Sequence, residues 1–225
     1  MLLDWLQDIL REWLKKVEDG SGELQATLHA ANSGDAMAQL RLGFLHYHGL
    51  RVTRDLSLAA SWVRRSAEQG VSQAQCALGE LYDYGEGVPR DFRLAYHWYL
   101  KAAELGLARA QAAVGSLLQH GHGVRQDDSE AARWYRQAAE QGEPSAQMNL
   151  ALYYINGGPF KKDIGEGLRW MKMAAASGVA TAEFNLALCY AQGIGVEENQ
   201  MESFDWMVRA AEHGHPRAQA LLSGR

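Results

Sequence analysis

Several residues of this sequence have types and spacings that could support chemistry. In the stretch Gly85-Glu86-Gly87, two glycines flank one residue, a spacing that in an enzyme can hold a phosphate. Three pairs of histidines, each two residues apart, could supply metal ligands: His46/His48, His120/His122 and His213/His215. Two cysteines could supply thiolates, and two adjacent acidic pairs could act as general acids and bases. The elements that position these residues decide between a chemical and a structural role.

The composition of the 225 residues excludes several classes of protein. Apolar residues make up 47% of the chain, which is enough for a buried core. With 22 basic and 27 acidic residues the net charge is -5, so we expect no nucleic-acid partner and no attraction to an anionic membrane. Asp4 and Asp8 lie where a signal peptide needs positive charge followed by an apolar run. We therefore expect a cytoplasmic protein, or a periplasmic one from which a leader was removed.

A repeat with a period of 36 residues organises the chain. Five of the seven tryptophans fall on this period without an insertion or deletion: Trp62, Trp98, Trp134, Trp170 and Trp206. Six glycines also fall on it: Gly34, Gly70, Gly106, Gly142, Gly178 and Gly214. Gly85 itself has counterparts in the other copies, namely Gly49, Gly121, Gly157 and Gly193. Because a phosphate-binding loop is needed only once, this recurrence favours a structural role for Gly85.

Each repeat is predicted to contain two helices, which we call helix A and helix B. In residues 71–106, Ala74, Leu78 and Leu81 follow the helical period and predict helix A, and a second apolar stripe through Trp98 predicts helix B. A capping side chain should start helix B in each repeat: Asp55, Asp91, Asp127, Asp163 or Asn199. In three repeats a glutamate three residues later completes a capping-box spacing: Glu130, Glu166 and Glu202. The periodic glycine after helix B should adopt a left-handed conformation and end it.

The turn between helix A and helix B contains the Gly-x-Gly run. The second half of this run is replaced by Leu50-Arg51 in the first repeat and by Gly158-Pro159 in the fourth. The helix that follows also lacks the lysine and the hydroxyl residue of a Walker-type loop. We therefore interpret Gly85-Glu86-Gly87 as a bend in the chain.

The other chemical candidates also have structural explanations. Cys76 and Cys189 align with apolar residues of the other repeats, which predicts core positions and no disulfide framework. Histidines two residues apart on a helix point about 200° away from each other, so we expect no metal site. The acidic pairs Asp127-Asp128 and Glu197-Glu198 fall in exposed turns. The sequence predicts neither a cofactor nor an enzyme.

The repeat resembles a known family. Residues 74–106 carry the pattern Ala, Leu-Gly, Leu-Tyr, Gly-x-Gly-Val, Asp, Ala, Trp and Ala-Ala, followed by a final glycine, and five copies cover residues 35–214. This pattern resembles the Sel1-like repeat family, which is related to the tetratricopeptide repeats. The resemblance implies an all-α fold, a right-handed α/α superhelical solenoid whose members hold partner proteins in a concave surface. The departures are mild, and Gly157-Gly158-Pro159 puts only the turn geometry of the fourth repeat in question.

The ends of the chain fit the same scheme of a single solenoid domain over residues 1–225. Residues 1–34 are predicted to be a degenerate capping repeat with a helix to about Val17, because four apolar residues lie 36 positions before the stripe of the next helix A: Leu2, Leu6, Ile9 and Leu10. The alternative is an amphipathic helix that contacts a membrane or a partner through Trp5 and Trp13. Residues 215–225 form half of a sixth repeat.

The predicted binding site consists of helix A positions that differ between the copies. These positions should face the concave side: Arg41, Phe44, Tyr47, His48, Glu80, Asp83, Tyr84, Ser116, His120, Asn149, Leu152, Ile155, Asn156, Asn185 and Leu188. The apolar members are expected in water and so mark a contact patch, and the arginine and asparagines could bind a peptide backbone. The alternative is that some of the apolar members pack against the neighbouring helix A.

We therefore expect a non-catalytic scaffold that binds a segment of another protein, of a composition typical of bacteria. Two alternatives stay open. One is a neutralising, immunity-type or regulatory binder of a bacterial secreted or envelope protein. The other is a structural solenoid that self-associates through its N-terminal helix or its C-terminal half repeat. Glutamate in place of Phe44 and Leu152 should abolish partner capture and leave the thermal melt nearly unchanged.

Overall fold

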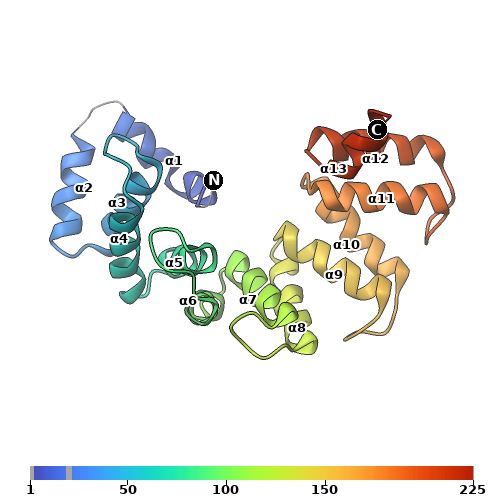
Figure 1. Cartoon of the computed structure of the whole chain (residues 1–225), viewed down its shortest axis with the longest axis horizontal. Coiled ribbons are helices and arrows are strands. Elements are labelled where there is room, and N and C mark those ends of the chain that lie inside the picture. The colour runs from blue at the N-terminus through green and yellow to red at the C-terminus, as the bar shows by residue number, and fades with distance from the viewer. Residues whose placement is uncertain (1–2, 19–21, 225) are drawn as a thin grey trace. The chain divides into compact units, whose positions relative to one another are not determined.

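The computed structural model describes residues 3–18 and 22–224, and thirteen α-helices with no strand make up the regular structure of these residues (Figure 1). Leu2 lies outside this part of the chain. The first two helices are α1 (Trp5–Glu18) and α2 (Glu23–Asn32). Ten helices follow, two to each repeat: α3 (Ala36–His48) and α4 (Leu56–Glu68), α5 (Ser72–Tyr84) and α6 (Phe92–Glu104), α7 (Ala108–His120) and α8 (Asp128–Glu140), α9 (Pro144–Asn156) and α10 (Ile164–Ala176), and α11 (Ala180–Gln192) and α12 (Gln200–Glu212). The last helix is α13 (Pro216–Leu222). The predicted all-α fold with a 36-residue period is confirmed.

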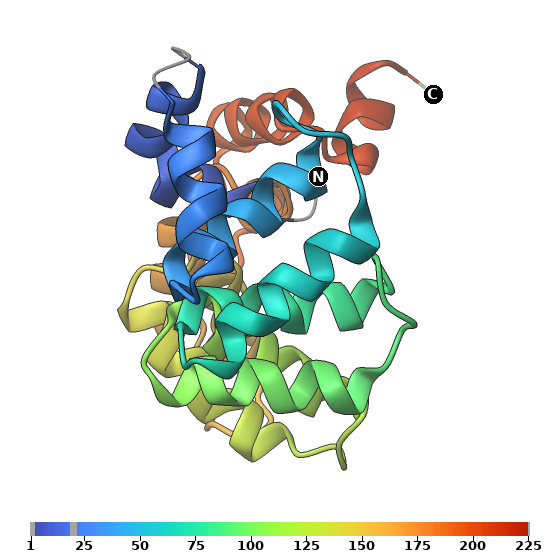
Figure 2. The same ribbon diagram turned by 90° about the vertical axis from the view of Figure 1, so that its left-hand side faces the viewer.

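The chain forms two compact units. Unit 1 is Met1–Gln126 and contains α1 to α7, and unit 2 is Asp127–Arg225 and contains α8 to α13. Within unit 1, the pairs α3–α4 and α5–α6 follow one another in chain order (Figure 2). That the whole chain is a single domain stays a prediction.

The predicted caps start each helix B of the five repeats. Asp55 accepts a hydrogen bond from the backbone nitrogen of Leu58 at 2.9 Å, and the other four predicted caps make the same kind of bond. In the fourth repeat, Glu166 donates its backbone N–H to Asp163, and its carboxylate accepts from Trp170 Nε1 at 2.8 Å. The periodic glycine after each helix B has a positive φ, as expected of a left-handed helix end.

A column of buried glutamines joins each helix A to the preceding helix B, and this column was missed in the sequence. Gln75 Nε2 donates to the backbone oxygen of Ala67 at 3.3 Å, and the equivalent buried glutamines bond in the same way: Gln39, Gln111 and Gln147. Gln219 of α13 makes the same bond to Ala211 from an exposed position. In the fifth repeat Glu183 takes the place of the glutamine and lies 2.8 Å from His213 Nδ1. These bonds satisfy backbone carbonyls in the last turn of helix B.

The second glycine of the Gly-x-Gly run permits a close backbone contact. A Cβ atom on Gly87 would lie less than 3.0 Å from the backbone oxygen of Leu56, at the start of the preceding helix B. A Cβ on Gly123 would likewise meet the backbone of Phe92, whereas one on Gly195 would meet the side chains of Ile164 and Leu168. Arg51 keeps the positive φ of this position, at 59°, without being a glycine.

The turn of the fourth repeat differs from the others, as Gly157-Gly158-Pro159 indicated. Gly85 ends its helix A with φ 74° and ψ 35°, whereas Gly157 has φ 80° and ψ -171°. In this turn Phe160 stacks on Tyr154 of the preceding helix, with ring centroids 4.9 Å apart. The Gly-x-Gly run is therefore a structural turn that tolerates variation.

Candidate protein-binding surface

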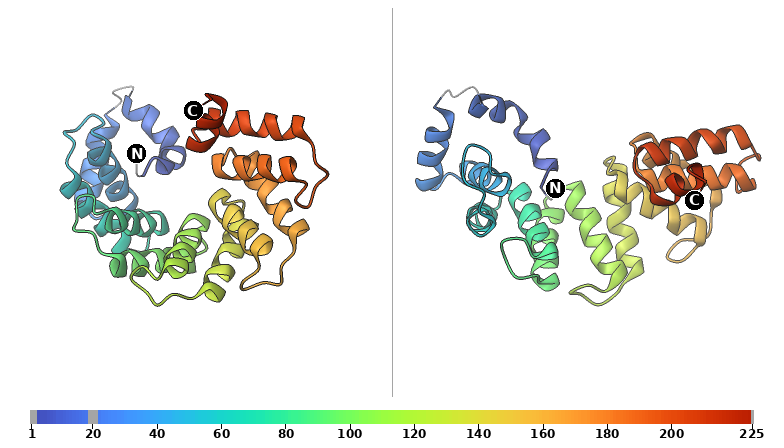
Figure 3. Two further views of the ribbon diagram at one scale, coloured as in Figure 1. Left: turned by 45° about the vertical axis from the view of Figure 1, so that its right-hand side comes forward. Right: turned by 45° about the horizontal axis from the view of Figure 1, so that its top comes forward.

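The predicted partner-binding residues all lie on A helices. In unit 1 they belong to α3, α5 and α7, and in unit 2 they belong to α9 and α11. The repeat therefore brings them together within each unit. Their surroundings differ between the two units, because α1 lies against the A helices of unit 1 (Figure 3).

Trp5 of α1 is held by an ion pair from two A helices. Its Nε1 donates to Glu80 Oε2 at 3.0 Å, and the guanidinium carbon of Arg109 lies 5.2 Å from the centroid of its ring. Arg109 Nε is 2.6 Å from Glu80 Oε1, and the Glu80 residue is only 4% exposed. The buried carboxylate thus has two donors, as a buried charge requires.

Trp13, two turns further along α1, has a similar arrangement. Its Nε1 donates to Thr27 Oγ1 of α2 at 3.3 Å, and the guanidinium carbon of Arg41 lies 5.3 Å from a ring centroid of the indole. A cation over an indole face is an attractive geometry. Both tryptophans of α1 therefore have one hydrogen-bond acceptor and one arginine.

His48 lies beside the N-terminal end of α1. Its side chain is 3% exposed, and its Nδ1 lies 3.9 Å from Asp4 Oδ1. The ring is 4.3 Å from that of Phe44 and 4.9 Å from that of Tyr47. Burial lowers the pKa of this imidazole and outweighs the opposite effect of Asp4, so the neutral form is favoured.

Besides the His48 side chain, three of the predicted site residues in unit 1 are not in water, and the expectation of exposure was wrong for them. Phe44 is 0% exposed, and Tyr47 and Glu80 are also buried. Tyr47 donates its hydroxyl to Glu86 in the turn that follows α5. Glutamate at Phe44 would therefore disrupt packing as well as binding, contrary to the unchanged melt expected from the sequence.

The predicted alignment of α1 with a standard helix A is wrong at Ile9. Ile9 is 48% exposed, whereas Leu45, its equivalent in α3, is fully buried. The buried face of α1 and of the two residues before it is formed by Leu3, Leu6, Leu10, Trp13 and Val17. This helix lies across A helices and does not form a standard pair with α2.

Other candidates in unit 1 remain accessible. Tyr84 is 64% exposed at the end of α5, and His120 is exposed at the end of α7, where its Nδ1 is 2.8 Å from the backbone oxygen of Ser116. Asp83 is half-buried near the hydroxyl of Tyr99, and burial raises the pKa of its carboxyl.

In unit 2 the equivalent positions are more open. Leu152 and Asn185 are half-buried, and Asn156 is exposed. Ile155 is a packing residue, because a Cβ on Gly167 of its own helix B would lie less than 3.0 Å from it. Leu188 packs against a cluster of Phe184, Ala210 and Ala218. Asn149 donates to the backbone oxygen of Ser145 at 3.0 Å.

Comparison with known families decides the identity of the repeat. The model of the Sel1 repeat matches five times, at residues 36–71, 72–107, 108–143, 144–179 and 180–215. The chain belongs to the Sel1 repeat family. Sel1 repeat proteins generally mediate protein–protein interactions, and the fold is generally a non-catalytic scaffold.

Solved Sel1 structures resemble this one. A Sel1 repeat protein from Oxalobacter formigenes is 33% identical, with a TM-score of 0.84 over 94% of this chain and 86% of the other. The protective antigen c5321 of uropathogenic Escherichia coli is 38% identical, with a TM-score of 0.81 over 89% of this chain, which spans 43% of that protein. The immunity protein Pa5087 of Pseudomonas aeruginosa, at 23% identity and a TM-score of 0.56 over 81% of this chain and 67% of the other, shares the fold. A search of curated proteins found no match.

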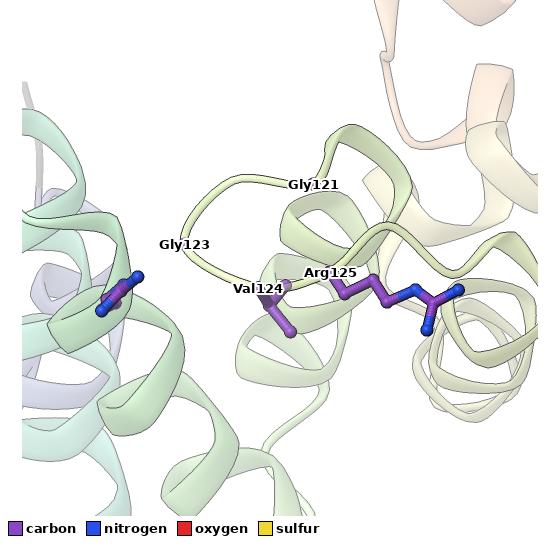
Figure 4. Close-up of a pocket in the computed structure, with 5 residues that line it drawn as sticks. Gly121, Gly123, Val124 and Arg125 are labelled. Atoms are coloured by element: carbon purple, nitrogen blue, oxygen red, sulfur yellow. The ribbon is translucent and has the colours of Figure 1, made fainter.

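The chemical candidates have structural roles in this Sel1 chain. The turn of the third repeat forms a hollow of about 450 Å³ lined by Gly121, Gly123, Val124, Arg125 and Arg93, but Arg125 extends away from the glycines (Figure 4). Within residues 3–18 and 22–224, no three potential metal ligands gather. His120 and His122 do stack, with centroids 5.5 Å apart, because Gly121 ends the helix between them.

Cys76 and Cys189 are buried free thiols, and burial raises the pKa of Cys189, so it is not an activated nucleophile. Among the described helices, none has both the length and the apolar character needed to cross a membrane.

Proposed function

We propose that this chain is a non-catalytic scaffold that binds a segment of a partner protein on its A-helix faces. One observation carries the proposal. The repeat positions that build the stack hardly vary between the five copies. The positions of helix A that are equivalent to Arg41, Phe44, Tyr47 and His48 do vary: Arg41, for example, becomes Asn149 in the fourth repeat, and Phe44 becomes Leu152. The variation does not alter the helices that carry it, since all five are 13 residues long.

The open part of the surface in unit 2 supports contact with a polypeptide. Leu152 offers a half-buried apolar side chain, and Asn149, Asn156 and Asn185 offer amides that can bind peptide groups. Two buried free cysteines are compatible with a reducing compartment, so we place the scaffold in the bacterial cytoplasm.

A neutralising role is the second candidate function. This role is favoured by the fold that the chain shares with immunity proteins of Pseudomonas aeruginosa. The neutralised partner would be a bacterial secreted or envelope protein. In that case the captured partner would be a toxin or envelope protein, and co-expression would protect cells from it.

The experiment is affinity capture from the native organism, followed by binding measurements with the purified partner. Asn185→Arg adds one positive charge to the A-helix face of α11. Ala176→Arg adds the same charge at an exposed position at the end of α10, on a helix B, and serves as the matched control.

We expect Asn185→Arg to weaken partner binding by about tenfold or more, as changes at the centre of an interface do, and Ala176→Arg to leave it unchanged. Equal affinity of both variants for the partner would refute the A-helix assignment. Light scattering of the chain alone tests self-association, and a stable oligomer that captures no partner would favour the structural alternative.

A further inference from the structure

We propose that the A-helix face of unit 1 is a docking groove for an amphipathic helix of another protein that carries tryptophan, and that α1 is an internal ligand which this helix displaces. The inference rests on the proposed function and names the kind of partner. It is read from the way α1 itself is bound.

The chemistry that holds Trp5 favours an aromatic ring that carries a hydrogen-bond donor, as an indole does. Glu80 accepts a hydrogen bond from the indole N–H at 3.0 Å, and Arg109 lies 5.2 Å from the ring centroid. Phenylalanine could replace the ring but not the N–H donor, and leucine could replace neither. Glu80 and Arg109 also form an ion pair with each other at 2.6 Å, so this ion pair of the groove does not require α1.

A second indole position follows eight residues later. Arg41 lies 5.3 Å from a ring centroid of Trp13, and residues eight apart lie on the same side of a helix. Leu6 and Leu10 are buried between the two tryptophans. A ligand helix therefore presents tryptophan at both ends of a short apolar stripe.

α1 is an imperfect ligand for this groove. Within the described part of the chain, Arg41 Nε and the Nε2 atom of His48 are buried with no hydrogen-bond partner. Buried polar atoms are rarely left unpaired, because each loses its bonds to water. A cavity of about 200 Å³ also remains between α1 and the first turn, lined by Leu14, Val17 and Leu45 among others. A partner helix with acceptors placed for Arg41 and His48 would fit better.

The stack of repeats does not depend on a helix such as α1. Leu152 and Leu188 are the equivalents of Phe44, and both are only half-buried while their repeats keep the same helices. Exposed Ile9 shows that α1 does not occupy the place of a standard helix A. The cover on unit 1 is therefore an addition to the fold, as an exchangeable ligand would be.

The test uses the full chain and a fluorescein-labelled synthetic peptide with the sequence of residues 3–18. In the chain variant Trp5→Ala/Trp13→Ala, the internal ligand loses both anchors. We expect the peptide to bind this variant at least about tenfold more tightly than the wild-type chain, because α1 competes in the latter. A peptide with Trp5→Phe should bind at least about fivefold more weakly, since the donor to Glu80 is lost. A peptide with Ile9→Ala is the matched control and should bind as the parent does.

A second measurement covers loss of folding in the double variant. In the wild-type chain labelled with ¹⁵N, excess unlabelled peptide should shift the indole N–H resonance of Trp5, assigned with Trp5→Phe. The proposal is overturned if the peptide does not bind and the Trp5 indole resonance does not move. It is also overturned if the Trp5→Phe peptide binds as tightly as the parent peptide. A dimer that the peptide dissolves, seen by light scattering, would make a second copy the occupant and overturn the partner assignment. If a captured partner responds to Asn185→Arg while the peptide does not bind, the proposed function stands and this inference fails.

Discussion

Alanine at Gly87 should destabilise the chain strongly, for two separable reasons. The backbone of Gly87 has φ +70°, and a left-handed conformation costs a residue with a Cβ about 1–2 kcal/mol. The new Cβ would also lie less than 3.0 Å from the backbone oxygen of Leu56, which cannot move away as a flexible side chain could. Overpacking of this kind typically costs about 1–3 kcal/mol. The expected loss in the free energy of unfolding is therefore about 2–5 kcal/mol.

Gly106→Ala is the matched control for the strain. Gly106 has φ +87°, but no atom lies within 4 Å of its added Cβ, so only the cost of about 1–2 kcal/mol remains. Arg51→Gly should have the opposite sign and stabilise by about 1 kcal/mol, because Arg51 already holds a positive φ of 59°.

The assay is urea denaturation followed by circular dichroism, with the three variants compared to the wild-type chain. If Gly87→Ala loses no more stability than Gly106→Ala, the close contact is not the reason for the second glycine, and the structural explanation of the Gly-x-Gly run is refuted. A Gly87→Ala chain of normal stability that failed to bind its partner would restore a functional role for the loop.

Three further predictions concern buried side chains. Burial, helped by the charge of Arg54, lowers the pKa of His48 and outweighs the raising effect of Asp4. When α1 is released, His48 is less buried and takes up a proton more readily, so the contact between α1 and α3 should weaken as the pH falls below about 6.5. Faster proteolysis of α1 at pH 5.5 than at pH 7.5, abolished by His48→Gln, is the expected result; an unchanged rate would contradict it. Phe44→Glu should cost about 4 kcal/mol or more in urea denaturation, because it removes a buried ring and buries a carboxylate; a near-normal midpoint would show that Phe44 is accessible. Alkylation of Cys189 at pH 7.5 should be at least about tenfold slower than that of a free cysteine and become normal in urea; rapid labelling of the native chain would disprove its burial.

Much of the fold could be predicted because the repeat states the same information five times. A single aspartate before an apolar stripe is a weak helix signal, but Asp55 and its four equivalents at the same spacing leave little alternative. The substitution at Gly157-Gly158-Pro159 likewise indicated an altered turn, and the ψ of Gly157 confirms it.

The glutamine column was predictable in principle and was missed. Gln39, Gln75, Gln111 and Gln147 recur at the 36-residue period, yet a polar residue on a helix is usually read as solvent-facing. Only the position of the preceding helix B shows that the amide reaches a buried carbonyl.

The exposure of the predicted binding residues could not be read from the sequence. The varying columns of helix A were identifiable from the copies, but their exposure was not. Phe44 and Leu152 occupy the same position in their repeats, and only one of them is covered. Trp13 of α1 and Asp4 just before it contact Arg41 and His48 on either side of Phe44, and no local pattern at Phe44 encodes the approach of this distant segment.

The sequence by itself determined the family, the helix pairs, their caps and the structural role of the Gly-x-Gly turns, because these depend on local propensities repeated at a constant period. The tertiary structure decided which face of unit 1 is accessible and what holds α1. Trp5, Glu80 and Arg109 come from three helices separated by long stretches of chain, so their contact depends on how those helices pack and not on any pattern within one of them.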